Sequence, residues 1–299
     1  MCIRDRLKPL FSEILILIKY RLSFSVVLSS VASYLLAFEI FSLSTFIILI
    51  VGGFLVVGSS NGFNQIIERE RDSLMSRTLN RPLPSGNMSI YQAIIVCSIL
   101  GLVGLFLLYT INFRTAFFGF VSMIIYLAVY TPLKPITPLS VFFGAIPGAI
   151  PFMLGWVAVT NKFSIETGIL FMIQFFWQFP HFWAIGWVSH DDYTRAGFKM
   201  LPSGKPDNAT AFQIVFYTIW MILVSTLPYF SFTGTFTVGL HSIILILVAG
   251  IFMLIQAIRL MKYKDNQNAI RLMYTSIFYL SFIQIISVSY THLTLPTKA

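Results

Sequence analysis

The chain has 299 residues, of which 57% are apolar and 16% aromatic while only 10% are charged, and its mean hydropathy is +0.82. Soluble domains carry about 25% charged residues, so the composition argues against a soluble enzyme. A membrane β-barrel is also excluded, because its strands alternate apolar and polar residues, whereas the long runs here are apolar on all sides. The composition predicts an all-α protein, a polytopic transmembrane helical bundle.

The net charge and the cysteines do not indicate nucleic-acid binding, a disulfide framework or a cysteine metal site. The net charge is +9, but no soluble basic domain is present to bind nucleic acid, and Lys and Arg in membrane proteins mostly mark cytoplasmic loops. Cys2 lies in a tail and Cys97 in an apolar run, so neither a disulfide framework nor a CxxC metal site is available.

Membrane spans follow from the length of the apolar runs, because a crossing needs about 20 residues. We expect about nine spans, at residues 20–39, 45–66, 90–111, 115–131, 139–160, 165–188, 211–231, 236–258 and 272–288. With the N-terminus in the cytoplasm, all of the 20 Lys and Arg residues except Arg114, Lys162 and Lys298 fall on the inside. The distribution predicts a cytoplasmic N-terminus.

The same distribution predicts one transmembrane domain over residues 20–288, preceded by a cytoplasmic segment, 1–19. The first residues, MCIRDR, and the tail 289–299 look like translated adapter sequence, and we expect the last span to be truncated or replaced near Ile286. Two cytoplasmic loops, 67–89 and 189–210, are long and polar, and such loops on a rigid scaffold commonly carry function.

The first polar constellation follows the second span. Asn64, Glu68 and Asp72 are four residues apart, so in a helix each step rises about 6 Å and rotates about 40° beyond a full turn, which places their oxygens on one face. Such oxygens suit Mg²⁺. Arg77 and Arg81 repeat the spacing, and guanidinium groups bind phosphate bidentately.

These residues have a simpler interpretation, in which the charges only solvate a helix end and Glu68 pairs with Arg69 or Arg71. We favour that interpretation for Arg69 and Glu70. We do not favour it for Asn64, Glu68 and Asp72, which we call the acid ladder, because Asn64 lies at the membrane boundary, where unpaired polar groups are costly.

The second constellation follows the sixth span. Gln174, Gln178 and His181 form a polar stripe that should face the bundle interior, and Pro180 predicts a kink. A core histidine bonded to a neighbouring helix and a functional histidine are equally good interpretations of His181. Beyond the span stand two acids and then two bases, namely Asp191, Asp192, Arg195 and Lys199.

Other residues supplement these two motifs. Tyr130 and Lys134 lie in a short cytoplasmic loop, from which the lysine either reaches the same anion or only sets topology. Six aromatic residues of the sixth span are candidates for lining a pocket, although at each single position we favour helix packing or lipid contact: Phe175, Phe176, Trp177, Phe179, Phe182 and Trp183.

Four motifs in order, NQIIERERDSLMSRTLNRPLPSG, YTPLKPITPLSVFFGAIPGAIPFMLGW, WQFPHFW and DDYTRAGFKMLP, resemble the protohaem IX farnesyltransferase (haem O synthase) family of UbiA-type intramembrane prenyltransferases. The resemblance runs from about Lys19 to about Ile285 and implies the UbiA-type prenyltransferase fold. One departure is Tyr20, which stands where the family commonly has proline.

The resemblance implies a Mg²⁺-dependent transfer of farnesyl from farnesyl diphosphate to a vinyl group of protohaem IX (haem B), in the bacterial inner membrane with a cytoplasmic active site. It implies that catalytic and metal-binding roles belong to Asn64, Glu68, Asp72, Asp191 and Asp192. Substrate binding then falls to Arg77, Arg81, Tyr130, Lys134, His181, Arg195 and Lys199. Haem-A synthase or oxidase assembly proteins are the partners it suggests.

Two other functions fit part of the sequence. A related prenyltransferase acting on an aromatic acid or a quinone precursor would share the diphosphate site. A transporter would instead place charge near the bilayer midplane and show internal repeats, whereas here the acids gather at one face.

Overall fold

The computed structural model describes residues 3–38 and 40–294, with side chains at 10–38, 40–230 and 232–291. Within these residues the chain is helical, without strands. The helices are α1 (Ile3–Leu17), α2 (Tyr20–Ala37), α3 (Leu43–Asp72), α4 (Ile90–Ile111), α5 (Phe113–Ile124), α6 (Thr131–Leu133), α7 (Ser140–Thr160), α8 (Ile165–Val188), α9 (His190–Arg195), α10 (Asn208–Thr226), α11 (Leu240–Tyr263) and α12 (Asn266–Thr294). A π-helical segment, η1 (Ile125–Tyr130), and two 3₁₀ turns, η2 (Leu227–Tyr229) and η3 (Ser231–Thr233), complete the set.

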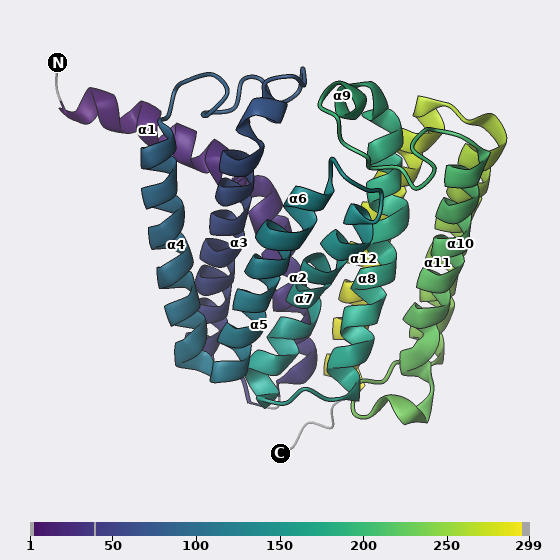
Figure 1. The fold of residues 1–299 in the computed structure, drawn as a ribbon. Helices are drawn as coiled ribbons and strands as arrows, with labels where there is room; N and C mark the ends of the chain where they lie inside the picture. Colours follow the sequence, from purple (N-terminus) through teal and green to yellow (C-terminus); the bar gives the residue numbers. More distant parts are fainter. Residues whose placement is uncertain (1–2, 39, 295–299) are drawn as a thin grey trace.

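The long helices run up and down beside one another, as Figure 1 shows. Eight helices in the described part of the chain are long and apolar enough to cross a membrane, so this is an integral membrane protein. The expected span that is missing from these eight, 165–188, corresponds to α8, which has the length of a span and runs alongside the others, but polar residues lower its hydropathy. The prediction of a helical membrane bundle of about nine helices is confirmed.

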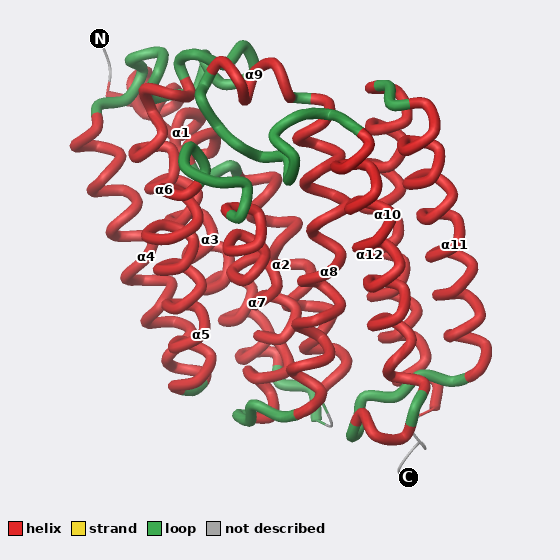
Figure 2. The backbone as a smooth tube through the Cα atoms, turned by 45° about the vertical axis from the view of Figure 1, so that its right-hand side comes forward, coloured by secondary structure: helices red, strands yellow, loops and turns green. Residues whose placement is uncertain are grey.

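The polar connections gather at one end of the bundle. Both views place α1, α9 and the α3–α4 connection at the end opposite the chain's C-terminus (Figures 1 and 2). Cap residues set where helices begin there: Ser89 accepts from the Gln92 amide at 3.2 Å, which starts α4, and Asp207 accepts from the Thr210 amide at 3.0 Å, which starts α10.

Small residues allow the central helices to approach closely, as is common between helices in membranes. A Cβ on Gly155 of α7 would lie 2.0 Å from the Ser30 carbonyl oxygen of α2. Ser30 Oγ also donates to the Pro151 carbonyl at 2.8 Å. Helix α7 is the most enclosed of the eight candidate spans in the described chain, because 72% of the residues in its 18-residue apolar stretch are buried inside the bundle.

Prolines inside α7 create acceptors that neighbouring helices use. Pro151 has no N–H, so the carbonyl of Pro147 loses its helical donor, and Ser122 Oγ donates to it at 3.2 Å. From α8, Gln174 donates to the Gly148 carbonyl at 2.9 Å and Gln178 to the Ala145 carbonyl at 2.8 Å. The predicted polar stripe of α8 therefore faces the bundle interior.

Candidate functional site

The acid ladder of α3 is buried at the polar end of the bundle. Asn64, Glu68 and Asp72 have exposed fractions of 1%, 5% and 1%. All three belong to one unbroken helix, so the four-residue spacing places them on one face as predicted. Asn61 extends this face deeper, where its amide donates to Ser23 Oγ at 3.1 Å.

Each carboxylate of the ladder has its own cation. Glu68 Oε1 lies 2.8 Å from Lys134 Nζ, and Glu68 Oε2 accepts from the same nitrogen at 3.1 Å. Asp72 Oδ2 lies 2.6 Å from Arg81 Nη1. Burial alone would lower the pKa of Lys134, but the Glu68 carboxylate outweighs burial and holds that pKa above its usual value. The site thus carries alternating charges in a nearly dry environment.

The alternative partners of Glu68 considered from the sequence are wrong. Arg69 pairs with Glu70 at 3.0 Å on the exposed surface, as the solvation interpretation predicts. Arg71 turns toward α9, where its Nη1 donates to the Ala196 carbonyl at 2.7 Å. Neither arginine reaches Glu68, because both project from other faces of α3.

A lysine that was not predicted to belong to the site contacts the first residue of the acid ladder. Lys19, at the junction of α1 and α2, donates to Asn64 Oδ1 at 3.2 Å. Burial, with the charges of Arg81 and Lys134, lowers the pKa of Lys19 to about 7. Asn64 Nδ2 donates in turn to Thr131 Oγ1 at 3.1 Å. The Lys19 φ of 47° lies in the left-handed region, which no sequence pattern around it signals.

The second acidic motif packs against the connection that follows the first. Ser76 Oγ donates to Asp192 Oδ1 at 3.0 Å, and Arg195 also pairs with Asp192. The Arg77 guanidinium lies 4.6 Å from the centroid of the Tyr193 ring. Asp191 is exposed on the same short helix. The two loops predicted to share one site are therefore in direct contact.

The third predicted loop joins the same cluster. Lys134 Nζ lies 4.5 Å from the centroid of the Tyr130 ring. The Lys199 amide donates to the Lys134 carbonyl at 2.7 Å, and Lys199 Nζ donates to the Ile136 carbonyl at 3.1 Å. Tyr130 ends the π-helical segment η1, a kind of irregularity that is frequent at functional sites.

His181 lies apart from this cluster. It belongs to α8, stacks on Trp177 with ring centroids 4.6 Å apart, and its Nδ1 lies 2.8 Å from Ser276 Oγ of α12. His181 and Asp191 lie on different helices, because α8 ends at Val188 and α9 begins at His190. Its contact with α12 matches the interpretation of a histidine bonded to a neighbouring helix.

The aromatic residues of α8 mostly pack within the bundle. Phe179 lies 4.3 Å from Tyr217, and Trp183 lies 5.1 Å from the same ring, measured between centroids. Phe176 stacks on Trp220 of α10 at 6.0 Å. These contacts leave the helix-packing interpretation in place for the three residues.

A metal site was predicted across both acidic motifs, and the ligand chemistry fits only in part. Among the described residues, no three His, Cys, Asp or Glu side chains converge closely enough to hold an ion, and Glu68 and Asp72 are paired with Lys134 and Arg81. Yet Asp72 Oδ1 is buried without a hydrogen-bond partner. A hard oxygen left without a partner beside Asn64 and Glu68 suits Mg²⁺.

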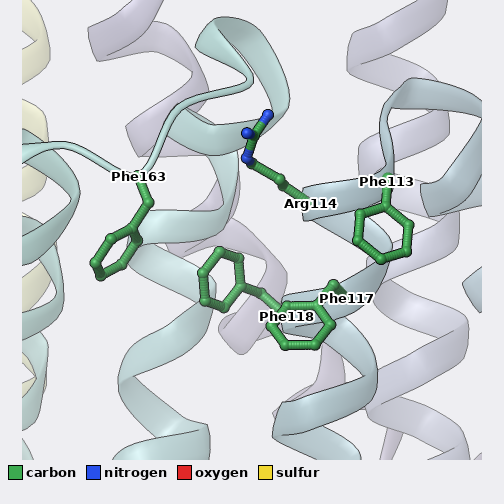
Figure 3. Close-up of a pocket in the computed structure, with 5 residues that line it drawn as sticks. All are labelled: Phe113, Arg114, Phe117, Phe118 and Phe163. Carbon is green, nitrogen blue, oxygen red and sulfur yellow. The ribbon is translucent and has the colours of Figure 1, made fainter.

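One cavity lies away from the acid ladder. Its volume is about 390 Å³, and it is lined by Phe113, Arg114, Phe117, Phe118 and Phe163 (Figure 3). These residues belong to the start of α5 and the α7–α8 connection, at the end of the bundle opposite the acid ladder. The cavity therefore takes no part in the candidate site.

Comparison with known proteins shows which family the chain belongs to. The model of the UbiA prenyltransferase family matches residues 26–283. A protein from Flavobacterium psychrophilum named protoheme IX farnesyltransferase is 52% identical over 94% of both chains. One of the same name from Christiangramia forsetii is 55% identical over 90% of both chains.

Solved structures show the same fold. A structure described as digeranylgeranylglyceryl phosphate synthase has a TM-score of 0.77 at 20% identity, covering 96% of this chain and 99% of that one. A UbiA homolog from Archaeoglobus fulgidus, bound to DMAPP and Mg²⁺, has a TM-score of 0.67 at 14% identity, covering 93% and 99% of the two chains.

Proposed function

Because this chain belongs to the UbiA prenyltransferase family, we propose that it transfers a farnesyl group from farnesyl diphosphate to a vinyl group of protohaem IX, which yields haem O. The relatives that share about half of its sequence carry the name of that activity. The acceptor rests on this similarity, and the diphosphate site rests on the side chains at the polar end of the bundle.

The observation that supports the proposal most strongly is the convergence of acids and cations from three segments. Glu68 and Asp72 come from α3, Lys134 from the α6–α7 connection, and Asp192 from α9. A diphosphate needs cationic donors for its oxygens, while a divalent ion bound to it needs hard anionic ligands. Both kinds of group are present within one contiguous cluster.

The cations have a direct role in this scheme. Arg77, Arg81 and Lys134 would hold the diphosphate and stabilise the charge that grows on it as the carbon–oxygen bond breaks. Tyr130, Arg195 and Lys199 line the same cluster and would complete the binding surface. Magnesium, held by oxygens of Asn64, Glu68, Asp72, Asp191 and Asp192, would neutralise part of the same charge.

The reaction balances without a redox step. The electron pair of the broken bond leaves with the diphosphate, and the allylic cation is attacked by the vinyl π electrons. Water then adds to the resulting cation beside the porphyrin ring and loses a proton, which leaves a hydroxyethylfarnesyl substituent. The apolar helices around the ladder would keep water from capturing the allylic cation first.

The location follows from the charge distribution. We place the acid ladder and the N-terminus on the cytoplasmic face of a bacterial inner membrane, since the Lys and Arg residues concentrate at that end. We also propose haem-A synthase or oxidase assembly proteins as partners, because they would take up the product.

Comparison of haems extracted from membranes tests the proposal. Cells that produce the chain should contain haem O, identified by reverse-phase chromatography, and cells that lack it should contain only haem B. If the quinones of the two membranes differ while the haems do not, the acceptor is a quinone precursor instead.

A further inference from the structure

His181 is an ionisable group of the transmembrane region that the diphosphate site does not use. Its side chain is half-buried, and it contacts Trp177 on its own helix and Ser276 on α12. Ser276 is fully buried, and its carbonyl accepts from Trp177 Nε1 at 2.6 Å. Two neighbouring aromatic side chains of α8 are thus fastened to a single residue of α12.

The hydrogen bonds determine which ring nitrogen of His181 carries the proton. Ser276 Oγ donates its only hydrogen to the Met273 carbonyl at 2.6 Å. The same oxygen, 2.8 Å from His181 Nδ1, must therefore accept from the ring. The Met273 carbonyl also accepts from the imidazole. Both acceptors lie on one turn of α12, so the proton belongs on Nδ1, the nitrogen that faces α12.

The other ring nitrogen is then free to bind a metal. An uncharged imidazole, the form favoured where an unpaired charge would be costly, has a lone pair on the nitrogen without the proton. A protein histidine that binds a metal usually donates its second N–H to a carbonyl, carboxylate or water, which fixes the tautomer and the ring orientation. Here the Ser276 hydroxyl is in the position of that outer partner.

We propose that His181 Nε2 is an axial ligand to the iron of the porphyrin acceptor and that Ser276 is the positioning residue that keeps its tautomer. This inference rests on the proposed function, since the His181 side chain would bind the acceptor of the proposed reaction. The lone pair of Nε2 forms the bond to iron, and no proton or electron is transferred. The ligand class is an iron porphyrin, which an imidazole distinguishes from a metal-free ring.

Position in the bundle agrees with this role. His181 lies two turns of α8 before the helix ends at Val188, so it is deeper than the α9 acids but in the same half of the bundle. Trp177 stacks on its ring and Phe182 lies 5.5 Å away, centroid to centroid. An apolar, aromatic surrounding suits a porphyrin ring. Because His181 lies deeper than the α9 acids, a porphyrin bound there would not displace the diphosphate from the acid ladder.

Titration of the full-length protein in lipid nanodiscs with ferric protohaem tests the inference. The wild type should show the electron paramagnetic resonance and resonance Raman signatures of a histidine axial ligand. His181→Ala should lose those signatures and bind haem at least about tenfold more weakly, and added imidazole should restore them. His241→Ala is the matched control, since His241 is an exposed histidine at the start of α11, and it should resemble the wild type.

Two further arms separate ligation from packing. Metal-free protoporphyrin IX should bind wild type and His181→Ala equally, because it has no iron. Ser276→Ala should weaken haem binding by about tenfold and alter the histidine signature, with binding of metal-free porphyrin unchanged. If His181→Ala weakens binding of both porphyrins equally, or if its haem spectrum matches that of the wild type, the ligand assignment is wrong.

The outcome for the proposed function is read separately, from haem O formation by the wild type. Haem O formed without any histidine signature refutes the iron ligand alone. A His181-dependent signature without haem O refutes the transferase activity and leaves the haem site standing. Absence of haem binding by the wild type refutes both.

Discussion

The most informative residues of this protein are two carboxylates that are buried and paired with basic side chains. A buried charge is tolerated only when it is paired, and Glu68 with Lys134 and Asp72 with Arg81 meet that condition at 2.8 and 2.6 Å. The pairs keep acids and cations side by side, which the proposed diphosphate site requires.

Asp72→Asn removes the anion but keeps the size of the side chain. Because Asp72 Oδ1 is buried without a hydrogen-bond partner and so is available to a divalent ion, we expect haem O formation to fall at least about 100-fold, with partial recovery at raised Mg²⁺. Glu70→Gln is the matched control, because the Glu70 side chain is 84% exposed, and its rate should equal that of the wild type. Loss of activity in both variants alike would contradict a special role for Asp72.

Arg77→Lys retains the charge and removes the planar guanidinium over Tyr193. A lost charged hydrogen bond costs about 1.5–3 kcal/mol, so KM for farnesyl diphosphate should rise by about tenfold or more, while Arg77→Ala should be worse. Steady-state kinetics with varied farnesyl diphosphate measure this. Arg69→Lys, at an exposed pair, should leave KM unchanged, and an unchanged KM in Arg77→Ala would remove Arg77 from the site.

Helical spacing alone was enough to predict the shared face of Asn64, Glu68 and Asp72, since period and composition are local. The partners were not predictable in the same way. Lys134 is 66 residues from Glu68, and Lys19 reaches Asn64 only because its own backbone adopts a left-handed conformation. Such pairings depend on how separate helices meet, which one sequence does not encode in any short pattern.

At the scale of elements, the bundle depends on close approach of α2 and α7. Gly155→Ala would place a methyl group 2.0 Å from the Ser30 carbonyl and 2.4 Å from Ser33 Oγ. Both neighbours are held within the bundle, so the helices must separate, and overpacking of this kind costs about 1–3 kcal/mol. We expect a lower thermal inactivation temperature in detergent.

Gly168→Ala is the control for this prediction. Gly168 lies in α8, and a Cβ there would meet nothing within 4 Å, so its inactivation temperature should equal or exceed that of the wild type. Equal stability of the two alanine variants would show that the α2–α7 contact tolerates separation.

Span lengths and most helix limits were predictable from apolar runs, because the bilayer demands a minimum length. The limits of α8 match the expected span 165–188, but the separate short helix α9 was not predicted, since Ser189 has no glycine or proline beside it to signal a break between two helices. The π-helical segment before Lys134 was missed for a similar reason: its sequence, IYLAVY, fits an ordinary helix.

For the whole molecule, the decisive feature is that both long loops lie at one end. Contacts such as Ser76 with Asp192 require it. In a background without Cys2 and Cys97, Ser85→Cys and Ser203→Cys should be labelled in intact cells only by a membrane-permeant maleimide. Lys162→Cys, at the opposite end, should be labelled by an impermeant reagent. Opposite accessibility of Ser85→Cys and Ser203→Cys would contradict a shared site.

The central claim is that the acid ladder activates a prenyl diphosphate whose prenyl group goes to protohaem. The most direct measurement quantifies haem O and free diphosphate together in one reaction of the purified chain with farnesyl diphosphate, protohaem and Mg²⁺. The two products should form in equal amounts, and Glu68→Gln should lower both by at least about 100-fold. Diphosphate release without haem O in the wild type, or full turnover by Glu68→Gln, would contradict the claim.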